Sequence, residues 1–97
     1  MEELIRSALS NRNLVEFTYD GRVRVCEVHV MGIANGVTQV LCFQVSGGSR
    51  RGKLPNWRRF DLGSMGDLVL KDETFSGKRA IPSGTHSIWD QVLAVVS

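Results

Sequence analysis

Residues 14–31 read LVEFTYDGRVRVCEVHVM, and their pattern is that of a β-hairpin. Val15, Phe17 and Tyr19 alternate with polar residues, which is the period of a strand with one buried face, and Asp20-Gly21 marks a turn. A second run rich in valine follows the turn. We therefore expect a mainly β fold built outward from this hairpin.

The length of the loop sets the register of this hairpin. A two-residue loop would place Arg24 opposite Phe17, whereas a three-residue loop over residues 20–22 places Val25 there and turns Arg24 to the other face. We expect the longer loop, because it keeps one face apolar. The apolar phase then changes between Val25 and Cys26, which predicts a bulge or bend of the kind that turns a barrel corner.

A second hairpin follows, because Asn35-Gly36 is a two-residue turn sequence. Its returning strand carries alternating apolar residues, which are Val37, Leu41, Phe43 and Val45. In this register Cys42 lies opposite His29 and Cys26 lies opposite Val45, so a disulfide between the two cysteines would be awkward. We expect two reduced thiols, as in a cytosolic protein.

The segments outside the two hairpins supply one helix and further strands. Apolar residues recur at helical spacing near the N-terminus, at Leu4, Ile5, Ala8 and Leu9. In WRRFDL, residues 57–62, Phe60 and Leu62 share a parity and are expected to point inward. The alternate residues are then expected to point outward: Trp57, Arg59 and Asp61. Leu68 and Leu70 mark a last core strand.

The length predicts a single domain over residues 1–97. Its parts are a helix over 1–13, a barrel over 14–76, and a linker with a C-terminal strand over 77–97. The tail IWDQVLAVVS suits a strand or a short amphipathic helix, and Val95 and Val96 favour the strand. The fold class is mainly β: a small, partly open SH3-like or Sm-like barrel of about five strands, preceded by one short helix and followed by an extra strand.

Basic charge is concentrated in GGSRRGKLPNWRRF, residues 47–60. This segment holds no acid and five bases, which are Arg50, Arg51, Lys53, Arg58 and Arg59. The other 83 residues carry seven bases against all ten acids. Such asymmetry is typical of a protein with an anionic partner. Two interpretations are open: a groove in which Trp57 stacks on the bases of a single strand, or a solvated loop with Trp57 capping the barrel.

No catalytic or metal-binding constellation is evident. His29 and His86, the two histidines, have no nucleophile at a recognisable spacing, and the carboxylates form no metal-ligand grouping. The cysteines lie in apolar strands, where burial raises the pKa of a thiol. GGSRRGK lacks the Ser or Thr that follows the lysine of a phosphate loop. We therefore expect no enzymatic activity, no cofactor and no metal.

The sequence also bears on the compartment. No run approaches the roughly 18 to 20 apolar residues that cross a bilayer. The N-terminus, MEELIRSALS, is acidic where a signal peptide would be basic and then apolar. We expect a cytoplasmic protein with no membrane partner.

Three segments together resemble the WYL domain, an Sm-like barrel family common in bacteria. They are ALSNRNLVEFTYDG, RVCEVHVMG and WRRFDLGSM, followed by a Leu-Val-Leu strand and Phe75, and the resemblance covers roughly residues 4–76. Members of that family usually sit behind a DNA-binding helix-turn-helix, and some are accessory to phage defence and CRISPR systems. The resemblance implies a regulatory domain that senses a ligand through a basic cleft, in several cases single-stranded nucleic acid or a nucleotide.

The family pattern is matched by position at Tyr19, Arg24 and Arg59. Other family positions differ: the Trp-Tyr-Leu falls on Gln39-Val40-Leu41, the second arginine on Ser64-Met65, and a proline on Val28. A weakened site and a changed ligand are therefore both open, and the arginines that could compensate are Arg50, Arg51 and Arg58. No helix-turn-helix precedes the barrel in this sequence, so we do not expect promoter binding.

Together these patterns predict a non-catalytic sensor or accessory module that binds single-stranded nucleic acid or a nucleotide. The ligand-binding residues are expected to be Arg59, Arg24, Arg58, Trp57, Tyr19, Arg50 and Arg51. The alternative is a protein-interaction or oligomerisation module that uses the barrel edge and the C-terminal tail to bind a protein partner or a second copy of the chain.

Overall fold

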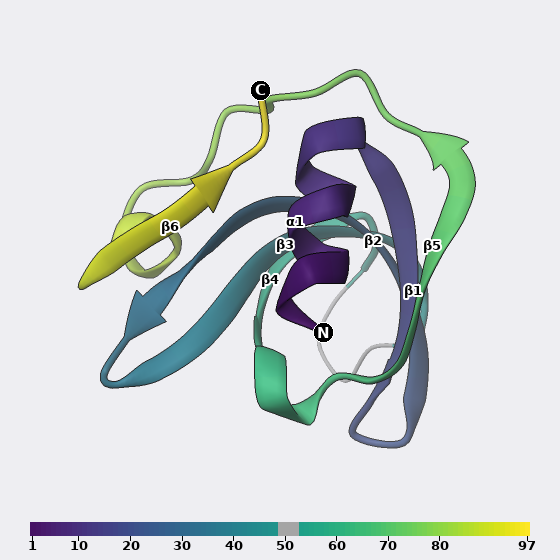
Figure 1. Cartoon of the computed structure of the whole chain (residues 1–97), viewed down its shortest axis with the longest axis horizontal. Coiled ribbons are helices and arrows are strands. Elements are labelled where there is room, and N and C mark those ends of the chain that lie inside the picture. Colours follow the sequence, from purple (N-terminus) through teal and green to yellow (C-terminus); the bar gives the residue numbers. More distant parts are fainter. Residues whose placement is uncertain (49–52) are drawn as a thin grey trace.

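The computed structural model describes residues 1–48 and 53–97, which form one N-terminal helix and a curved antiparallel sheet (Figure 1). The elements are α1 (Glu2–Asn11), β1 (Asn13–Tyr19), β2 (Arg22–Ala34), β3 (Val37–Gly47), β4 (Asn56–Asp61), the 3-10 turn η1 (Leu62–Ser64), β5 (Gly66–Thr74), the 3-10 turn η2 (Thr85–Ser87) and β6 (Gln91–Val95). The predicted mainly β class, with one N-terminal helix and a C-terminal extra strand, is confirmed.

The long strand β2 organises the sheet, whose strand order is β4-β3-β2-β1-β5. One edge of β2 pairs with β3, and the other edge pairs first with β1 and then, beyond Glu27, with β6. Helix α1 lies against the concave side of the curved sheet (Figure 1), where Ile5, Ala8 and Leu9 are buried in the core. The core is therefore closed by the helix on the side that the sheet leaves open.

The β1–β2 hairpin has the two-residue loop, so the predicted three-residue loop is wrong. Asp20 and Gly21 have φ values of 51° and 73°, the left-handed conformations of a tight turn that matches the twist of the strands. Tyr19 then pairs with Arg22, and Phe17 pairs with Arg24. Arg24 consequently shares the inner face with Phe17, and the residue is only 5% exposed.

The second hairpin turns at Asn35-Gly36 as predicted, with φ values of 53° and 76°. Its register shifts between Val25 and Cys26, where a bulge was expected, and again between Val28 and Val30.

At the second shift His29 has no pairing partner on β3, so Cys42 faces Val28 and not His29. Cys26 faces Gln44 in place of the predicted Val45, and both thiols are free and buried. On β3 the residues that join the core are Val40 and Cys42. Of the alternating apolar residues on that strand, Leu41 is also fully buried, whereas Phe43 and Val45 are half-buried and Val37 is 42% exposed.

The remaining elements follow the sequence closely. Phe60 and Leu62 are buried, and Leu68 and Leu70 pack against the core from β5. The C-terminal tail forms a strand, β6, as the β-branched residues favour. No helix in the described part of the chain has the length and apolar character needed to cross a membrane.

Residues 77–90, here called the C-terminal segment, are held against the outer face of β2, β3 and β4. The indole of Trp89 approaches Gly32 on β2, and the Asp90 carboxylate accepts a 2.7 Å hydrogen bond from the Asn35 amide. The Asp90 amide donates to the carbonyl of Ile33 at 2.9 Å. These contacts fix the end of the C-terminal segment directly before β6 begins.

The close approach of Trp89 requires a glycine at position 32. A Cβ atom there would lie 2.5 Å from Trp89 Cε3 and 2.6 Å from the carbonyl oxygen of Gln91. We expect Gly32→Ala to destabilise the fold by about 1–3 kcal/mol, the usual cost of overpacking. The control is Gly63→Ala, because a Cβ at Gly63 meets nothing within 4 Å. Chemical denaturation of both variants tests this, and equal stability would contradict it.

Candidate functional site

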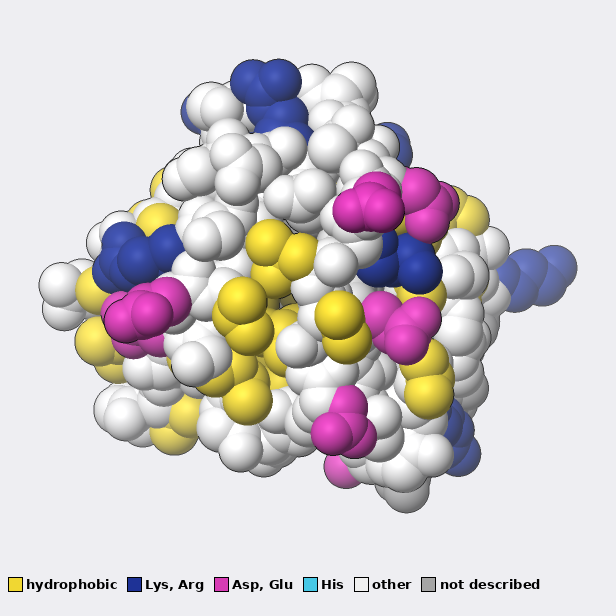
Figure 2. All heavy atoms as spheres, turned by 45° about the vertical axis from the view of Figure 1, so that its right-hand side comes forward, with side chains coloured by type: hydrophobic (Ala, Val, Ile, Leu, Met, Phe, Trp, Pro, Cys, Tyr) yellow, Lys and Arg dark blue, Asp and Glu magenta, His cyan; other side chains and the backbone are white. Residues whose placement is uncertain are grey.

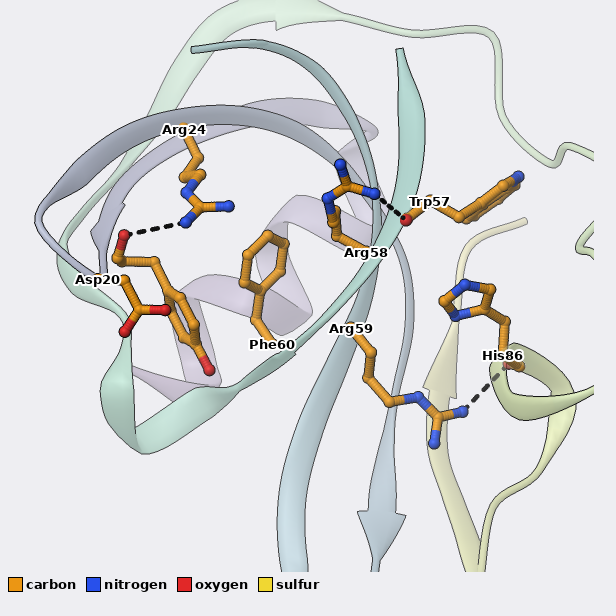
Figure 3. A pocket seen from close by; sticks show the side chains of 8 residues that line it. Asp20, Arg24, Trp57, Arg58, Arg59, Phe60 and His86 are labelled. Carbon is orange, nitrogen blue, oxygen red and sulfur yellow. Dashed lines mark hydrogen bonds between the residues drawn. The ribbon is translucent and has the colours of Figure 1, made fainter. Parts of the chain in front are cut away.

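A pocket of about 450 Å³ opens between β4 and the β1–β2 turn (Figure 3). Its lining consists of Tyr19, Asp20, Arg24, Trp57, Arg58, Arg59, Phe60 and His86. Five residues predicted to bind a ligand lie in it: Tyr19, Arg24, Trp57, Arg58 and Arg59. The other two, Arg50 and Arg51, lie outside the described residues. Asp20, Phe60 and His86 are lining residues that the sequence analysis did not select.

Arg24 enters the pocket because the two-residue turn places it on the inner face. Its Nη2 donates to the carbonyl of Tyr19 at 3.2 Å, and its Nη1 contacts Gln44 Oε1 at 3.5 Å. The buried Nε has no hydrogen-bond partner. Within residues 1–48 and 53–97, no carboxylate forms an ion pair with Arg24. A desolvated guanidinium without a counterion is a strong local attraction for an anion.

Aromatic rings form the floor beneath this guanidinium. The Arg24 Cζ lies 5.7 Å from the centroid of Tyr19 and 5.5 Å from that of Phe60. The two rings meet edge to face at 4.8 Å, and Phe17 packs against Phe60 at 5.0 Å. The hydroxyl oxygen of Tyr19 accepts a hydrogen bond from the Asp61 amide at 3.1 Å. The floor is therefore rigid, and cation–π attraction holds Arg24 above it.

Arg58 provides a second guanidinium from β4. It has the same strand parity as Phe60, and in Figure 3 Arg24 and Arg58 lie on either side of the Phe60 ring. Its Nη1 donates to the carbonyl of Trp57 at 3.2 Å. Two arginines from different strands thus converge on one pocket, which is a common way of recognising phosphate groups.

Arg59 points the other way, toward the C-terminal segment (Figure 3). Its Nη1 donates to the carbonyl of Ile88 at 2.9 Å, its Nη2 donates to the carbonyl of His86 at 3.1 Å, and its Cζ lies 3.7 Å from the ring centroid of Trp89. Burial lowers the pKa of Arg59. The predicted outward parity of Arg59 holds, but its guanidinium anchors the C-terminal segment.

Trp57 is also engaged by the protein. Its ring packs edge to face against His29 at 4.9 Å and against Phe43 at 5.2 Å. In Figure 3 the indole projects away from Phe60, so mainly the backbone end of Trp57 borders the pocket. The other aromatic side chains of the lining are Tyr19, which is half-buried, and Phe60, which is buried.

His86 reaches the pocket from the C-terminal segment. Figure 3 shows its ring turned toward β4. Its Nδ1 is buried and has no hydrogen-bond partner. Burial lowers the pKa of His86, and the charges of Arg59 and Arg58 lower it further. No sequence motif indicates this placement, because it depends on how Arg59 folds a distant segment back over β4.

A second group of charges, Glu27, His29 and Arg79, lies on the outer face of the sheet. Arg79 binds the buried Glu27 carboxylate at 2.7 and 2.8 Å, and His29 Nε2 lies 2.9 Å from Glu27 Oε1. Burial alone would raise the pKa of Glu27, but the hydrogen bonds from Arg79 and His29 bring it below its usual value. Since Arg79 also lies over the ring of Phe43, this group attaches the start of the C-terminal segment to the barrel.

The opposite side of the molecule has a different character. Figure 2 brings β1 and β5 forward and shows acidic side chains spread around an apolar patch. Here Lys71 Nζ lies 3.7 Å from Glu16 and 3.8 Å from Glu73. The lysine is thus neutralised by acids, in contrast to Arg24.

Comparison with known proteins found no matching family model, no similar curated protein and no similar solved structure.

The buried histidine makes the stability of the fold depend on pH. Burial lowers the pKa of His29 in the folded chain, although Glu27 opposes this. The unfolded chain therefore binds more protons below about pH 6.5. We expect the melting temperature to be highest above that pH and to fall on acidification toward about pH 5.5.

The variant His29→Gln tests whether His29 causes this pH dependence, because without the imidazole the melting temperature should vary less with pH. His86→Gln is the matched control: the pKa of His86 is also lowered, but its ring is less buried, so the slope should change less. Thermal melts at several pH values measure both effects. An unchanged slope in His29→Gln would contradict the assignment.

Proposed function

We propose that this protein is a non-catalytic sensor or accessory module that binds single-stranded nucleic acid or a nucleotide through the pocket between β4 and the β1–β2 turn. The observation that carries the proposal is Arg24, which is buried with no acidic partner among the described residues and faces a cavity that Arg58 also lines.

The chemistry of the pocket favours a nucleotide-like anion over a simple ion. The guanidinium groups supply the charge that attracts phosphate, and the half-buried ring of Tyr19 supplies an aromatic surface for a base. Asp20 at the rim adds one negative charge, which limits how many phosphates the pocket itself can hold. A nucleotide, or a short stretch of a single strand that places one or two phosphates and a base in the pocket, fits this balance.

The resemblance to the WYL domain supports the same proposal. Of the positions that match that family, Tyr19 and Arg24 contribute directly to the pocket, and Arg59 lines it while holding the C-terminal segment. We propose that the protein is a divergent relative of these domains that acts in the bacterial cytoplasm. A nucleic-acid or nucleotide ligand is what this relationship would imply.

The test is fluorescence anisotropy with labelled oligothymidylate at several salt concentrations. Arg24→Met keeps an unbranched side chain of similar apolar character at its base and removes the charged guanidinium, so we expect affinity to fall by about tenfold or more. The dependence on salt should weaken by about 0.7 in the slope of log K against log salt, since one phosphate contact is lost.

The matched control is Arg6→Met, an equal change of charge on the exposed surface of α1, where Glu2 is the ion-pair partner of Arg6 among the described residues. It should bind as the wild type does. Equal losses in both variants would mean non-specific attraction, and no loss in Arg24→Met would refute the site.

A second candidate function is association through β6. In the described chain β6 pairs only with β2, so its other edge is free, and Ile88, Val92 and Val95 nearby are each at least 48% exposed. An exposed strand edge with apolar side chains can add a strand from a partner or from a second copy.

Light scattering across a range of concentrations tests this candidate. If β6 mediates self-association, Val92→Lys should shift the protein toward monomer, because a lysine opposes pairing at an edge. Val69→Lys, at an equally exposed valine on β5, should leave the mass unchanged. A wild type that is monomeric at all concentrations would exclude the dimer.

A further inference from the structure

We propose that His86 is a ligand-contacting residue of this pocket and takes up a proton when the anion binds, so that affinity rises as the pH falls. The inference rests on the proposed function and names a third basic group of the same site, supplied by the C-terminal segment and not by the barrel.

Geometry places the imidazole at the pocket and leaves it without partners. His86 lines the cavity together with Arg24 and Arg58. Its buried Nδ1 has no hydrogen-bond partner, and no side-chain hydrogen bond joins its ring to any other described residue. The other ring nitrogen, Nε2, is not buried and also makes no hydrogen bond to a described residue, so it is the nitrogen that a ligand in the cavity would contact.

The position of the ring is enforced through the backbone. Arg59 binds the carbonyls of His86 and Ile88 and stacks on Trp89, and Asp90 is fixed to the β2–β3 turn by hydrogen bonds to Asn35 and Ile33. Arg79 attaches the start of the same segment to Glu27. The backbone on both sides of His86 is therefore fixed to the barrel, so the imidazole is not needed to hold the segment in position.

The charges around the ring explain why protonation and binding are linked. Arg58 and Arg59 face it from β4, and Arg24 and Tyr19 line the same cavity from β2 and β1. Among the described lining residues, Asp20 at the turn is the single acid. Without a ligand, burial and then the charges of Arg59 and Arg58 lower the pKa of His86 and so favour its neutral form. A bound phosphate offsets those charges and accepts a hydrogen bond from the imidazolium, so the protonated form becomes the favoured one.

The direction of the pH effect follows from linkage. The complex binds one more proton than the free protein and ligand, so affinity increases on acidification until the free histidine itself is protonated. If binding raises the pKa of His86 by one unit, affinity rises by up to about tenfold over that range. A neutral glutamine at position 86 removes this dependence.

The experiment uses hexathymidylate with a 5′-hydroxyl, which has no group that titrates between about pH 6 and pH 8. Affinity is measured at both ends of this range for the wild type, His86→Gln and Arg24→Met. We expect the wild type to bind several-fold more tightly at the lower pH. We expect His86→Gln to bind equally at both, and Arg24→Met to bind weakly throughout.

A second measurement needs no variant. The pKa values of both histidines are followed by NMR with and without the oligonucleotide: that of His86 should rise, and that of His29, which is held by Glu27 on the outer face, should stay constant. Arg24-dependent binding with no pH effect and no shift at His86 would overturn this inference and leave the proposed function standing. No binding at low salt at either pH would overturn both.

Discussion

The left-handed turn at Asp20-Gly21 is the constraint on which the pocket depends. Because the side chains of a strand alternate, a change of one residue in this loop would exchange the two faces of β2. The observed loop sends Arg24 inward opposite Phe17 and leaves Val23 52% exposed. The fold thus places a cation where a valine would complete an apolar core, and the Tyr19 and Phe60 rings accommodate it.

The C-terminal segment has a corresponding role on the other side of β4. Without it, the outward parity of Arg59 would leave its guanidinium in solvent. The segment instead buries Arg59 under two backbone carbonyls and Trp89, and it carries His86 to the pocket. The pocket is therefore made by two parts of the chain that are far apart in sequence, and Gly32 is the position on β2 that lets them meet.

Local patterns in the sequence predicted the helix, the Asn35-Gly36 turn, the inward Phe60 and Leu62, and the strand at the C-terminus. The wrong loop length at Asp20 has a physical cause. The prediction assumed that a buried face contains only apolar residues, whereas Arg24 and Gln44 are buried on it. Neither the position of His86 in the pocket nor the anchoring role of Arg59 could be predicted, because each depends on contacts between β4 and a segment 27 or more residues later.

The two buried charges of the barrel differ in a way that bears on function. Glu27 is buried with both carboxylate oxygens bound by Arg79 and with His29 beside it, so its charge is compensated within the chain. Arg24 is as deeply buried, yet among the described residues it has only carbonyl-type acceptors and aromatic rings. A buried pair can be neutral for stability, but an unpaired buried charge opposes folding. The residue that compensates Glu27 is itself part of the C-terminal segment, whereas the compensation that Arg24 lacks is what an anionic ligand would bring.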